Sequence, residues 1–461
     1  MDIKILKKFI AAFLTVMMAL TSAVRYGGIV IKSRFTGSDY SLQRIDLSVK
    51  PEGIDEKFDY LYDLATLDNS LDYAAHPDSV LLKNGNILTM YPAGHGKGAV
   101  LSKISTDGGL SWNASLENTP ESWKNSRETP TVYRLEFSDG KTADKLIMIS
   151  ANPKWGRQPT TGGFNCSISS DEGENWSEFE LFYDKNSDGG VIPIVAMSSL
   201  TRLKENGKFV DKWMGLFHDA DFYNYKTILT FDESGKMHWS KPEKYFSAYR
   251  DIEKRTNMCE VEVIRSEEGK GDELCLITRS NTKKENSLLS FSSDEGKTWS
   301  KPVYALNGER HKADYTPDGR LFITFRSIER GKKAAENAPI ENRNGWMSEG
   351  WVAWVGTYED LKNQTEGQYR IKLAHTYLKL QSNKDYAANA DTGYCGNVVL
   401  SDGTIVTTSY GCFDNTDFLK NLDFRTSIAS KRINLSDIDE LAVWLETQPK
   451  PEKTTNPVFG C

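Results

Sequence analysis

A short motif that ends in tryptophan recurs along the chain at a nearly fixed interval. Residues 292–299 read Ser-Ser-Asp-Glu-Gly-Lys-Thr-Trp, close copies fill 169–176 and 105–112, and a looser copy ends at Trp239. The Asp of each copy falls at 107, 171, 232 and 294, so the period is roughly 62 residues. A repeat of this kind predicts a propeller or a solenoid, with one supersecondary unit in each repeat.

The chemistry of the motif is that of a turn, and we call the four copies the Trp boxes. Their Ser and Asp side chains can accept hydrogen bonds from nearby backbone N–H groups, and Gly supplies a positive φ. The Trp ring can then pack the turn against the sheet. We therefore expect the Trp boxes to be structural elements of the outer rim and not ligand sites.

Six hairpin signals divide the chain into units. Each is a Gly-containing turn, mostly Asn-Gly or Asp-Gly, between apolar, β-rich runs, which is a strong local signal for two paired strands. Four of the six are followed by a Trp box. The pattern predicts an all-β fold, a six-bladed β-propeller of four-stranded antiparallel blades, with a helix only near 436–443. The hairpins lie at 83–85, 138–140, 205–207, 268–269, 317–319 and 401–403.

The N-terminus has the pattern of a targeting segment. Three lysines precede an apolar run over 9–20, and the small residues 21–23 follow it. This predicts a signal peptide over 1–23 and a secreted or cell-surface protein. The run is too short for a membrane span, so no stable membrane insertion is expected. The remaining divisions are an extension over 24–70 that packs on the propeller, the propeller over 71–445 and a polar tail over 446–461.

Charge and cysteine content narrow the partners. The net charge of −7 argues against a nucleic-acid partner, which needs a broad basic face. Six cysteines in an exported chain permit disulfides, and Cys395 and Cys412 flank one hairpin, so we expect them close together. The stretch 184–189 resembles half of a calcium loop, but Val195 stands where the bidentate Glu belongs. No metal and no cofactor are expected.

The innermost strands of a propeller begin at one mouth of its central channel, so equivalent residues there converge. Counting nine residues back from the Gly of each hairpin gives one position in each blade. The returning strands end near His95, His218, Asp219, Arg279, Arg326 and Tyr410. Acid, base and anion-binding side chains gathered in this way predict one functional pocket. The six counted positions are His76, Thr131, Ser198, Glu260, Arg310 and Tyr394.

Two segments carry a resemblance to a known family. Glu260 follows Cys259 and leads to Arg279-Ser280-Asn281, and Gly393-Tyr394-Cys395-Gly396 runs into the last hairpin. Together with the Trp boxes, these segments resemble the bacterial sialidase superfamily over roughly residues 70–435. The resemblance implies that Tyr394 is the nucleophile, that Glu260 is its partner and that Arg279 binds substrate. Arg310 and Arg326 are candidates for a further substrate-binding arginine.

The sequence also departs from that family at two places in the first blade. Ala75-His76-Pro77 stands where the family has Arg-Ile-Pro, and the loop 94–98 holds His95 but no carboxylate where the family has its acid/base Asp. Histidine can act as a general acid near neutral pH. We therefore assign His95 a catalytic role. His76, His311, His218 and Asp219 are predicted to contact the substrate.

This set of residues makes chemical sense as one device. Tyrosine is a poor nucleophile at its free pKa of about 10, and a neighbouring Glu can draw off its proton. Arg forks bind a sugar carboxylate through two hydrogen bonds. The prediction is a secreted, exo-acting, sialidase-like glycoside hydrolase that removes a terminal acidic sugar, sialic-acid-like or uronic, from a glycan.

Two other functions remain open. The first is a polysaccharide lyase, or a His-dependent glycosidase, that uses His95 or His76 with a tyrosine. The second is a non-catalytic glycan-binding propeller, which would keep the arginines and aromatic side chains such as Trp155 but would not need both Tyr394 and Glu260. A lyase releases an unsaturated product that absorbs in the near ultraviolet, which separates it from a hydrolase.

Overall fold

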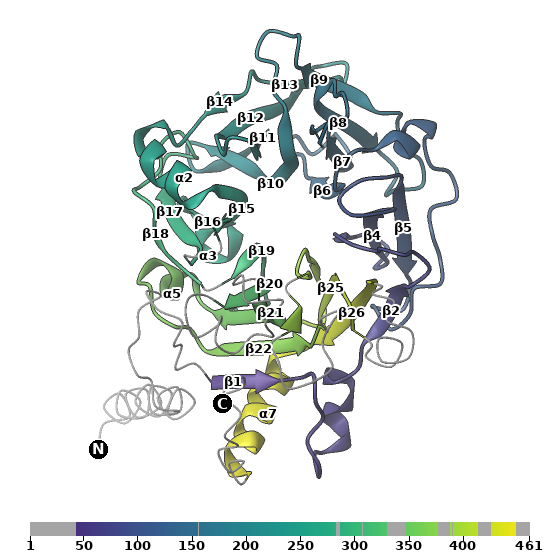
Figure 1. Ribbon diagram of the computed structural model, residues 1–461, viewed down its shortest axis with the longest axis vertical. Helices are drawn as coiled ribbons and strands as arrows, with labels where there is room; N and C mark the ends of the chain where they lie inside the picture. The colour runs from purple at the N-terminus through teal and green to yellow at the C-terminus, as the bar shows by residue number, and fades with distance from the viewer. Residues whose placement is uncertain are drawn as a thin grey trace, which may run out of the picture.

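A computed structural model of the chain describes residues 43–154, 156–282, 286–306, 308–329, 347–376, 388–389, 391–413 and 426–448. Six small sheets stand in a ring around one axis, and β6, β10, β15 and β19 are labelled nearest that axis (Figure 1). The predicted six-bladed, all-β propeller is confirmed. The predicted signal peptide, Trp155 and nearly all of the C-terminal tail lie outside the described residues.

Strands of each blade pair antiparallel in succession from the axis outwards, except that β14 pairs with β12 and β23 pairs with β21. The first three blades contain β3 (Asp78–Leu81), β4 (Ile87–Pro92) and β5 (Val100–Ser105); β6 (Thr131–Leu135), β7 (Lys145–Ala151), β8 (Gly162–Ser169) and β9 (Glu180–Asp184); and β10 (Pro193–Glu205), β11 (Lys208–Asp219), β12 (Asn224–Phe231), β13 (Met237–Trp239) and β14 (Glu243–Lys244).

The last three blades contain β15 (Met258–Arg265), β16 (Leu274–Ser280), β17 (Leu288–Ser292) and β18 (Val303–Tyr304); β19 (Glu309–Tyr315), β20 (Leu321–Glu329), β21 (Met347–Gly356), β22 (Tyr369–Ala374) and β23 (Ala388–Asn389); and β24 (Gly396–Val399), β25 (Ile405–Gly411) and β26 (Ser427–Ile433). In the first blade, a single bridge between Ile104 and Ala114 takes the place of a fourth strand.

The N-terminal segment closes the ring. β2 (Ala65–Asp68) pairs antiparallel with β26 and is the outermost strand of the sixth blade. β1 (Gln43–Asp46) pairs in parallel with β22 at the edge of the fifth blade. The sequence analysis placed both strands in an extension that ends at residue 70. Because β2 completes a blade, the first and last parts of the propeller are joined by backbone hydrogen bonds.

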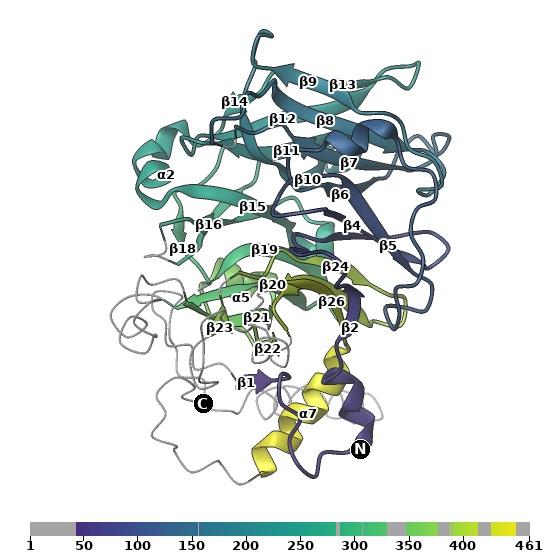
Figure 2. The same ribbon diagram turned by 45° about the vertical axis from the view of Figure 1, so that its right-hand side comes forward.

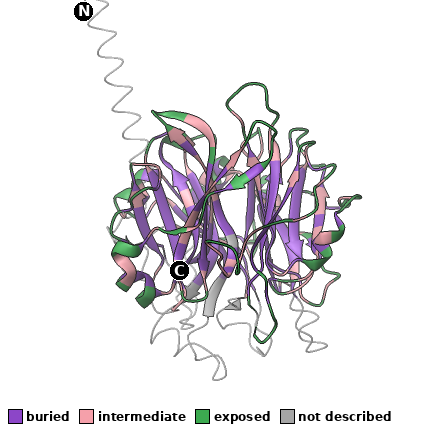
Figure 3. Ribbon diagram, turned by 90° about the horizontal axis from the view of Figure 1, so that it is seen from above, coloured by how far each residue is buried: buried purple, intermediate pink, exposed green. Residues whose placement is uncertain are grey.

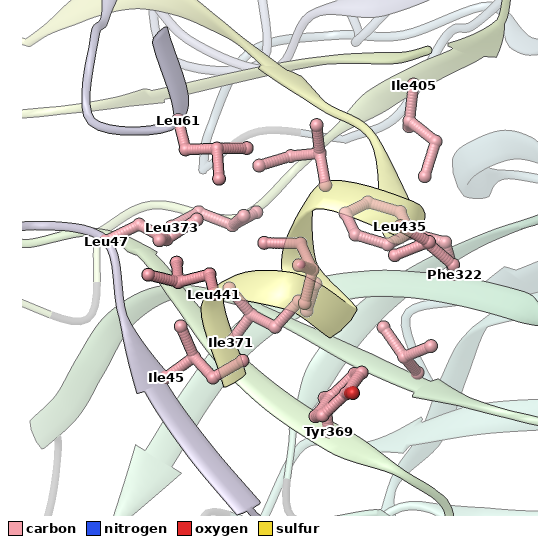
Figure 4. Packing of buried hydrophobic residues seen from close by; sticks show 14 of the residues in the cluster. Ile45, Leu47, Leu61, Phe322, Tyr369, Ile371, Leu373, Ile405, Leu435 and Leu441 are labelled. Carbon is pink, nitrogen blue, oxygen red and sulfur yellow. The ribbon is translucent and has the colours of Figure 1, made fainter. Parts of the chain in front are cut away.

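Helices are few, and the short helix α3 (Ser266–Gly269) joins the inner strands β15 and β16 of the fourth blade (Figure 1). The longest in the described part of the chain is α7 (Leu435–Thr447), near the predicted position; Asn434 caps it by accepting from the N–H of Ser436. Its buried face packs with β1, β22 and the 3₁₀ helix η1, so it covers the lower edge of the fifth and sixth blades (Figures 2 and 4). The short helices are η1 (Glu56–Leu61), η2 (Glu121–Asn125), η3 (Ser247–Tyr249), α2 (Arg250–Thr256), α3 (Ser266–Gly269) and α5 (Tyr358–Lys362). No helix within the described ranges is long and apolar enough to cross a membrane.

The innermost strands are tied to one another by hydrogen bonds from blade to blade. The N–H of Val132 donates to Asp78 Oδ2 at 3.0 Å, and the N–H of Val261 donates to Ser198 Oγ at 3.1 Å. Between the fifth and sixth blades, Asn397 Nδ2 donates to the Lys312 carbonyl at 3.2 Å. Buried strands therefore form a rigid wall around the axis, and exposure is concentrated in the loops (Figure 3).

Three of the four Trp boxes, those around Asp107, Asp171 and Asp294, share one hydrogen-bond pattern. In the copy at 292–299, Ser292 Oγ donates to Asp294 Oδ1 at 2.8 Å, the N–H of Gly296 donates to Ser292 Oγ at 2.9 Å, and Thr298 Oγ1 donates to Asp294 Oδ2 at 2.6 Å. The same bonds recur around Asp107 and Asp171. The polar side chains of the boxes are thus used within the turn.

The glycine of each of these boxes also contacts the preceding blade. Gly109 and Gly296 have φ of 87° and 73°. A Cβ on Gly109 would lie 2.5 Å from Val406, and one on Gly296 would lie 2.5 Å from Met214. Trp299 is buried and packs in one cluster with Met214 and Met258. Each box is therefore a clamp between neighbouring blades.

Five cysteines lie in the described part of the chain and all are buried; Cys166, Cys259, Cys275 and Cys395 are free thiols. The expected proximity of Cys395 and Cys412 is not found. Gly396 pairs with Thr408, so Cys395 comes opposite Ser409 and Cys412 lies three residues further along. Cys395 and Cys412 lie at nearly equal distances in sequence from the hairpin Gly, but they are not opposite each other in the register of the two strands.

We expect Trp299→Ala to destabilise the fold by about 3–5 kcal/mol, because a buried Trp between two blades is replaced by a cavity. Urea unfolding followed by circular dichroism measures this loss. Lys297→Ala, at an exposed position of the same box, is the matched control and should change stability by less than about 0.5 kcal/mol. Equal effects of the two substitutions would contradict the clamp.

Candidate functional site

A backbone irregularity marks the channel mouth in several blades. His76, Glu260 and Arg310, which the sequence count placed at equivalent positions, have φ of 53°, 48° and 56°. Register shifts accompany this conformation at Glu260 in β15 and at Arg310 in β19. Non-Gly residues adopt positive φ uncommonly, and such strain is often found at functional sites. In a regular strand these side chains would point into the blade. The bulges instead direct them toward the axis.

Tyr394 and Glu260 meet at the channel mouth although they come from the sixth and the fourth blade, with the fifth blade between them. The Tyr394 hydroxyl donates a hydrogen bond to Glu260 Oε1, and both side chains are buried. Gly393, with a φ of 86°, lies so close to β20 that a Cβ there would come within 2.5 Å of the backbone nitrogen of Arg326. Only glycine fits this approach, which places Tyr394 at the mouth.

The protonation states of this pair are opposite. Burial acts to raise the pKa of Glu260, but the charges of Arg279 and Arg310 outweigh it and hold that pKa well below its usual range. Burial and the negative charge of Glu260 raise the pKa of Tyr394 well above its usual value. At neutral pH the site therefore holds an ionised carboxylate that accepts a hydrogen bond from a neutral phenol.

Arg279 and Arg326 are fixed by carboxylates. Arg279 Nη1 lies 2.7 Å from Glu260 Oε2, and its Nη2 lies 3.0 Å from Glu309 Oε2. Arg326 donates to the same oxygen of Glu309 at 3.1 Å. Glu309 is completely buried, so these charges are shielded from solvent and interact strongly with one another. Two of the three predicted substrate-binding arginines are thus already engaged within the protein.

Arg310 differs from the other two. Its Nε and Nη1 atoms have no hydrogen-bond partner among the described residues, although its side chain is largely buried. Its guanidinium carbon lies 5.1 Å from the centre of the Tyr394 ring, within range of a cation–π contact. Unpaired buried N–H groups are costly, and a bound anion would satisfy them.

His76 and His95 lie beside Tyr394. The ring of His76 is 4.3 Å from that of Tyr394 and 5.2 Å from that of His95. Burial and the nearby His95 lower the pKa of His76, and its Nδ1 accepts a hydrogen bond from the N–H of Gly96 at 3.2 Å. His76 is therefore neutral and fixed in place. His95 is exposed in the loop 94–98.

The other predicted contact residues are placed differently. His218 is buried near Glu260. Burial lowers the pKa of His218 to about 4, although the negative charge of Glu260 opposes this shift. Asp219 accepts from the backbone N–H groups of Asp221 and Tyr223, so its carboxylate serves a turn. His311 Nε2 lies 3.2 Å from Ser287 Oγ, at the junction between two blades, and is completely buried.

The sequence analysis missed Glu309, Glu128 and Tyr73, whereas it did place Tyr410 at this rim. Glu309 precedes Arg310 on the bulged strand, and a count of one position in each blade passes over it. Glu128 lies three residues before Thr131, in the loop that leads into β6. The hydroxyls of Tyr73 and Tyr410 donate to Asp391 at 2.7 and 3.0 Å, and the ring of Tyr73 is 4.9 Å from that of His95.

Replacing Arg279 with alanine should destabilise the protein by about 3–5 kcal/mol, because two buried carboxylates lose their shared partner. Urea unfolding near pH 7 measures the change. Arg310→Ala serves as the control and should cost clearly less, since two of its three nitrogens are unpaired. If Arg310→Ala proved as destabilising as Arg279→Ala, the difference between the two arginines would not hold.

Comparison with known proteins supports the fold. No protein-family model matches the sequence, and a search of curated proteins finds no match. The structure is similar to the NanB sialidase of Streptococcus pneumoniae, with a TM-score of 0.50 at 12% identity over 80% of this chain and 70% of that chain. It is also similar to an α-L-arabinofuranosidase of Fusarium graminearum, with a TM-score of 0.49 at 11% identity over 81% of this chain and 98% of that chain. At these identities the likeness shows the fold alone: this chain has the propeller fold that the NanB sialidase has.

Proposed function

We propose that the protein is a glycoside hydrolase that removes a terminal acidic sugar from a glycan, with Tyr394 as nucleophile and Glu260 as its base. One observation carries the proposal: a buried tyrosine hydroxyl donates to a carboxylate held ionised by arginines. A hydroxyl with an adjacent base is the arrangement of an activated nucleophile. The fold of a solved sialidase is consistent with this reading.

The reaction follows from the geometry in two displacements. Tyr394 Oη attacks the anomeric carbon while Glu260 takes the phenolic proton, and the glycosidic C–O bond breaks with protonation of the leaving oxygen. Water then attacks the same carbon, the bond to Tyr394 breaks, and Glu260 returns its proton to the phenolate. Two displacements at one carbon give net retention of configuration.

An acidic sugar suits this site for two reasons. A phenol that is neutral until it attacks avoids the repulsion that a carboxylate nucleophile would meet at an anionic anomeric centre. Arg310 offers unpaired N–H groups over the Tyr394 ring, where a sugar carboxylate could be bound. We assign Arg310 the carboxylate contact, with Arg279 and Arg326 holding Glu260 and Glu309 in place.

The remaining residues are assigned by position. His95 is exposed and stands beside the ring of Tyr73, so it is placed to contact the substrate or to exchange a proton. His76, being neutral and fixed, supports the ring of Tyr394. The N-terminal pattern over 1–23 favours action outside the cell, where glycan substrates are displayed.

One observation favours a second function. The ring of His76 lies 5.2 Å from that of His95 and 4.3 Å from that of Tyr394. These three side chains could abstract a proton from a uronic acid and eliminate the glycosidic oxygen. This lyase alternative releases an unsaturated sugar. Near-ultraviolet absorbance during digestion of acidic glycans separates it from hydrolysis, which creates reducing ends without absorbance.

Tyr394→Phe and Glu260→Gln should each lower kcat/KM by roughly 10²–10⁴-fold, and the double variant should lose little more, because the two residues act on one proton. Steady-state kinetics on the acidic glycoside that the native protein cleaves best measures all three. Thr131→Val, at an equivalent inner position whose hydroxyl bonds within its own blade, is the control. Full activity of Tyr394→Phe would remove Tyr394 from the mechanism.

A further inference from the structure

Glu128 is a buried acid beside the candidate site. It lies in the segment from Ser126 to Thr129, between η2 and β6, and its side chain is 1% exposed. Its carbonyl oxygen accepts from Ser126 Oγ at 3.1 Å and from Ser150 Oγ at 3.0 Å, which fixes the backbone. Its Oε2 atom has no hydrogen-bond partner among the described residues. A buried polar atom of this kind requires an explanation.

The segment joins a surface hollow to the channel mouth. Ser126 and Arg127, with Gly94 and Lys97, line a hollow of about 360 Å³. The loop that carries Gly94 and Lys97 is held on the segment because the N–H of Gly98 donates to the Ser126 carbonyl at 3.3 Å. Glu128 therefore follows directly on two residues that form the wall of this hollow.

On its other side the segment contacts the loop that holds His76, the neighbour of the nucleophile. Thr129 Oγ1 lies 3.7 Å from where a Cβ on Gly96 would be, and the N–H of Gly96 donates to His76 Nδ1. The ring of His76 packs against Tyr394 at 4.3 Å. Glu128 thus belongs to a segment that borders the hollow on one side and the loop beside His76 and Tyr394 on the other.

The charge state of Glu128 is the reverse of that of Glu260. Burial raises the pKa of Glu128 to about 8. The charge of Glu260 adds to this rise, whereas hydrogen bonds from Thr129 and the charge of Arg310 oppose it. The carboxyl is therefore protonated near neutral pH. Two carboxyl groups whose surroundings push their pKa values apart are the usual mark of an acid and a base in one site.

We propose that Glu128 is the proton donor to the leaving oxygen and that the adjoining hollow receives the leaving group. This inference rests on the hydrolase function proposed above. When the glycosidic C–O bond breaks, the Glu128 proton passes to the departing oxygen, which leaves as an alcohol. In the second displacement the Glu128 carboxylate takes a proton from the attacking water and returns to its starting state.

The test compares leaving groups. The probes are the 4-nitrophenyl and methyl glycosides of N-acetylneuraminic acid and of glucuronic acid. Nitrophenolate leaves without a proton, but methanol needs one. Glu128→Gln should lower kcat/KM on the methyl glycoside by roughly 10²–10⁴-fold and on the nitrophenyl glycoside by less than about tenfold. The alkaline fall in the pH–rate profile near pH 8 should be lost in the variant.

A matched control comes from deeper in the channel. Asp314 in β19 is a half-buried acid whose pKa is raised by burial, to about 7, and its buried Oδ2 atom is also unpaired among the described residues. Asp314→Asn should show no dependence on the leaving group. If Glu128→Gln lowered kcat/KM equally on both leaving groups, or not at all, the role of Glu128 would be overturned but the hydrolase function would not. A wild-type protein that cleaves none of the four probes would overturn the hydrolase function together with this role.

Protonation can be followed without turnover. The folded pKa of Glu128 is raised above its ordinary 4.5, so the stability of its neutral form is fully present below pH 4.5 and is lost as the pH rises through about 8. Glu128→Gln should therefore gain stability relative to wild type between these values, measured by urea unfolding at several pH values. A constant difference across this range would show that Glu128 is already ionised, which contradicts proton donation.

Discussion

The candidate site depends on two buried carboxylates that neutralise two arginines at the centre of the ring. Glu309 contacts Arg279 and Arg326, and Glu260 takes the other side of Arg279. Charges this deep are tolerated only when they are paired. The pairing has a chemical consequence, because it keeps Glu260 ionised in a place where burial alone would protonate it. An ionised Glu260 is what the Tyr394 hydroxyl needs as an acceptor.

The backbone that presents these groups is strained and is supported by its surroundings. Left-handed conformations at His76, Glu260 and Arg310 each carry an energetic cost, which persists only where neighbouring structure enforces it. The support comes from hydrogen bonds between inner strands and from Trp boxes that clamp blade to blade at the rim. Residues with no chemical role, such as Trp299 and Gly296, thus hold the geometry of residues that have one.

Sequence reasoning predicted the fold and the convergence of side chains, because both follow from periodic signals. The hairpin glycines gave equivalent positions, and His76, Glu260 and Arg310 share one unusual conformation. It did not predict Glu309, because a bulge suspends the alternation of strand faces on which such a count relies. It did not predict Glu128, which lies in a loop whose path follows from contacts with another blade. Nor did it foresee that β2 closes the ring, since a short strand pairing with one over 350 residues away leaves no local pattern.

The central claim is that the sugar is transferred to the hydroxyl of Tyr394, and mass spectrometry of the quenched protein tests it most directly. An acidic glycoside with an activated leaving group and a fluorine beside the anomeric carbon slows the second displacement, so the intermediate should accumulate. The account predicts one added sugar, located by peptide fragmentation at Tyr394. A protein that turns over the glycoside but carries the sugar on another residue, or on none, would contradict the account.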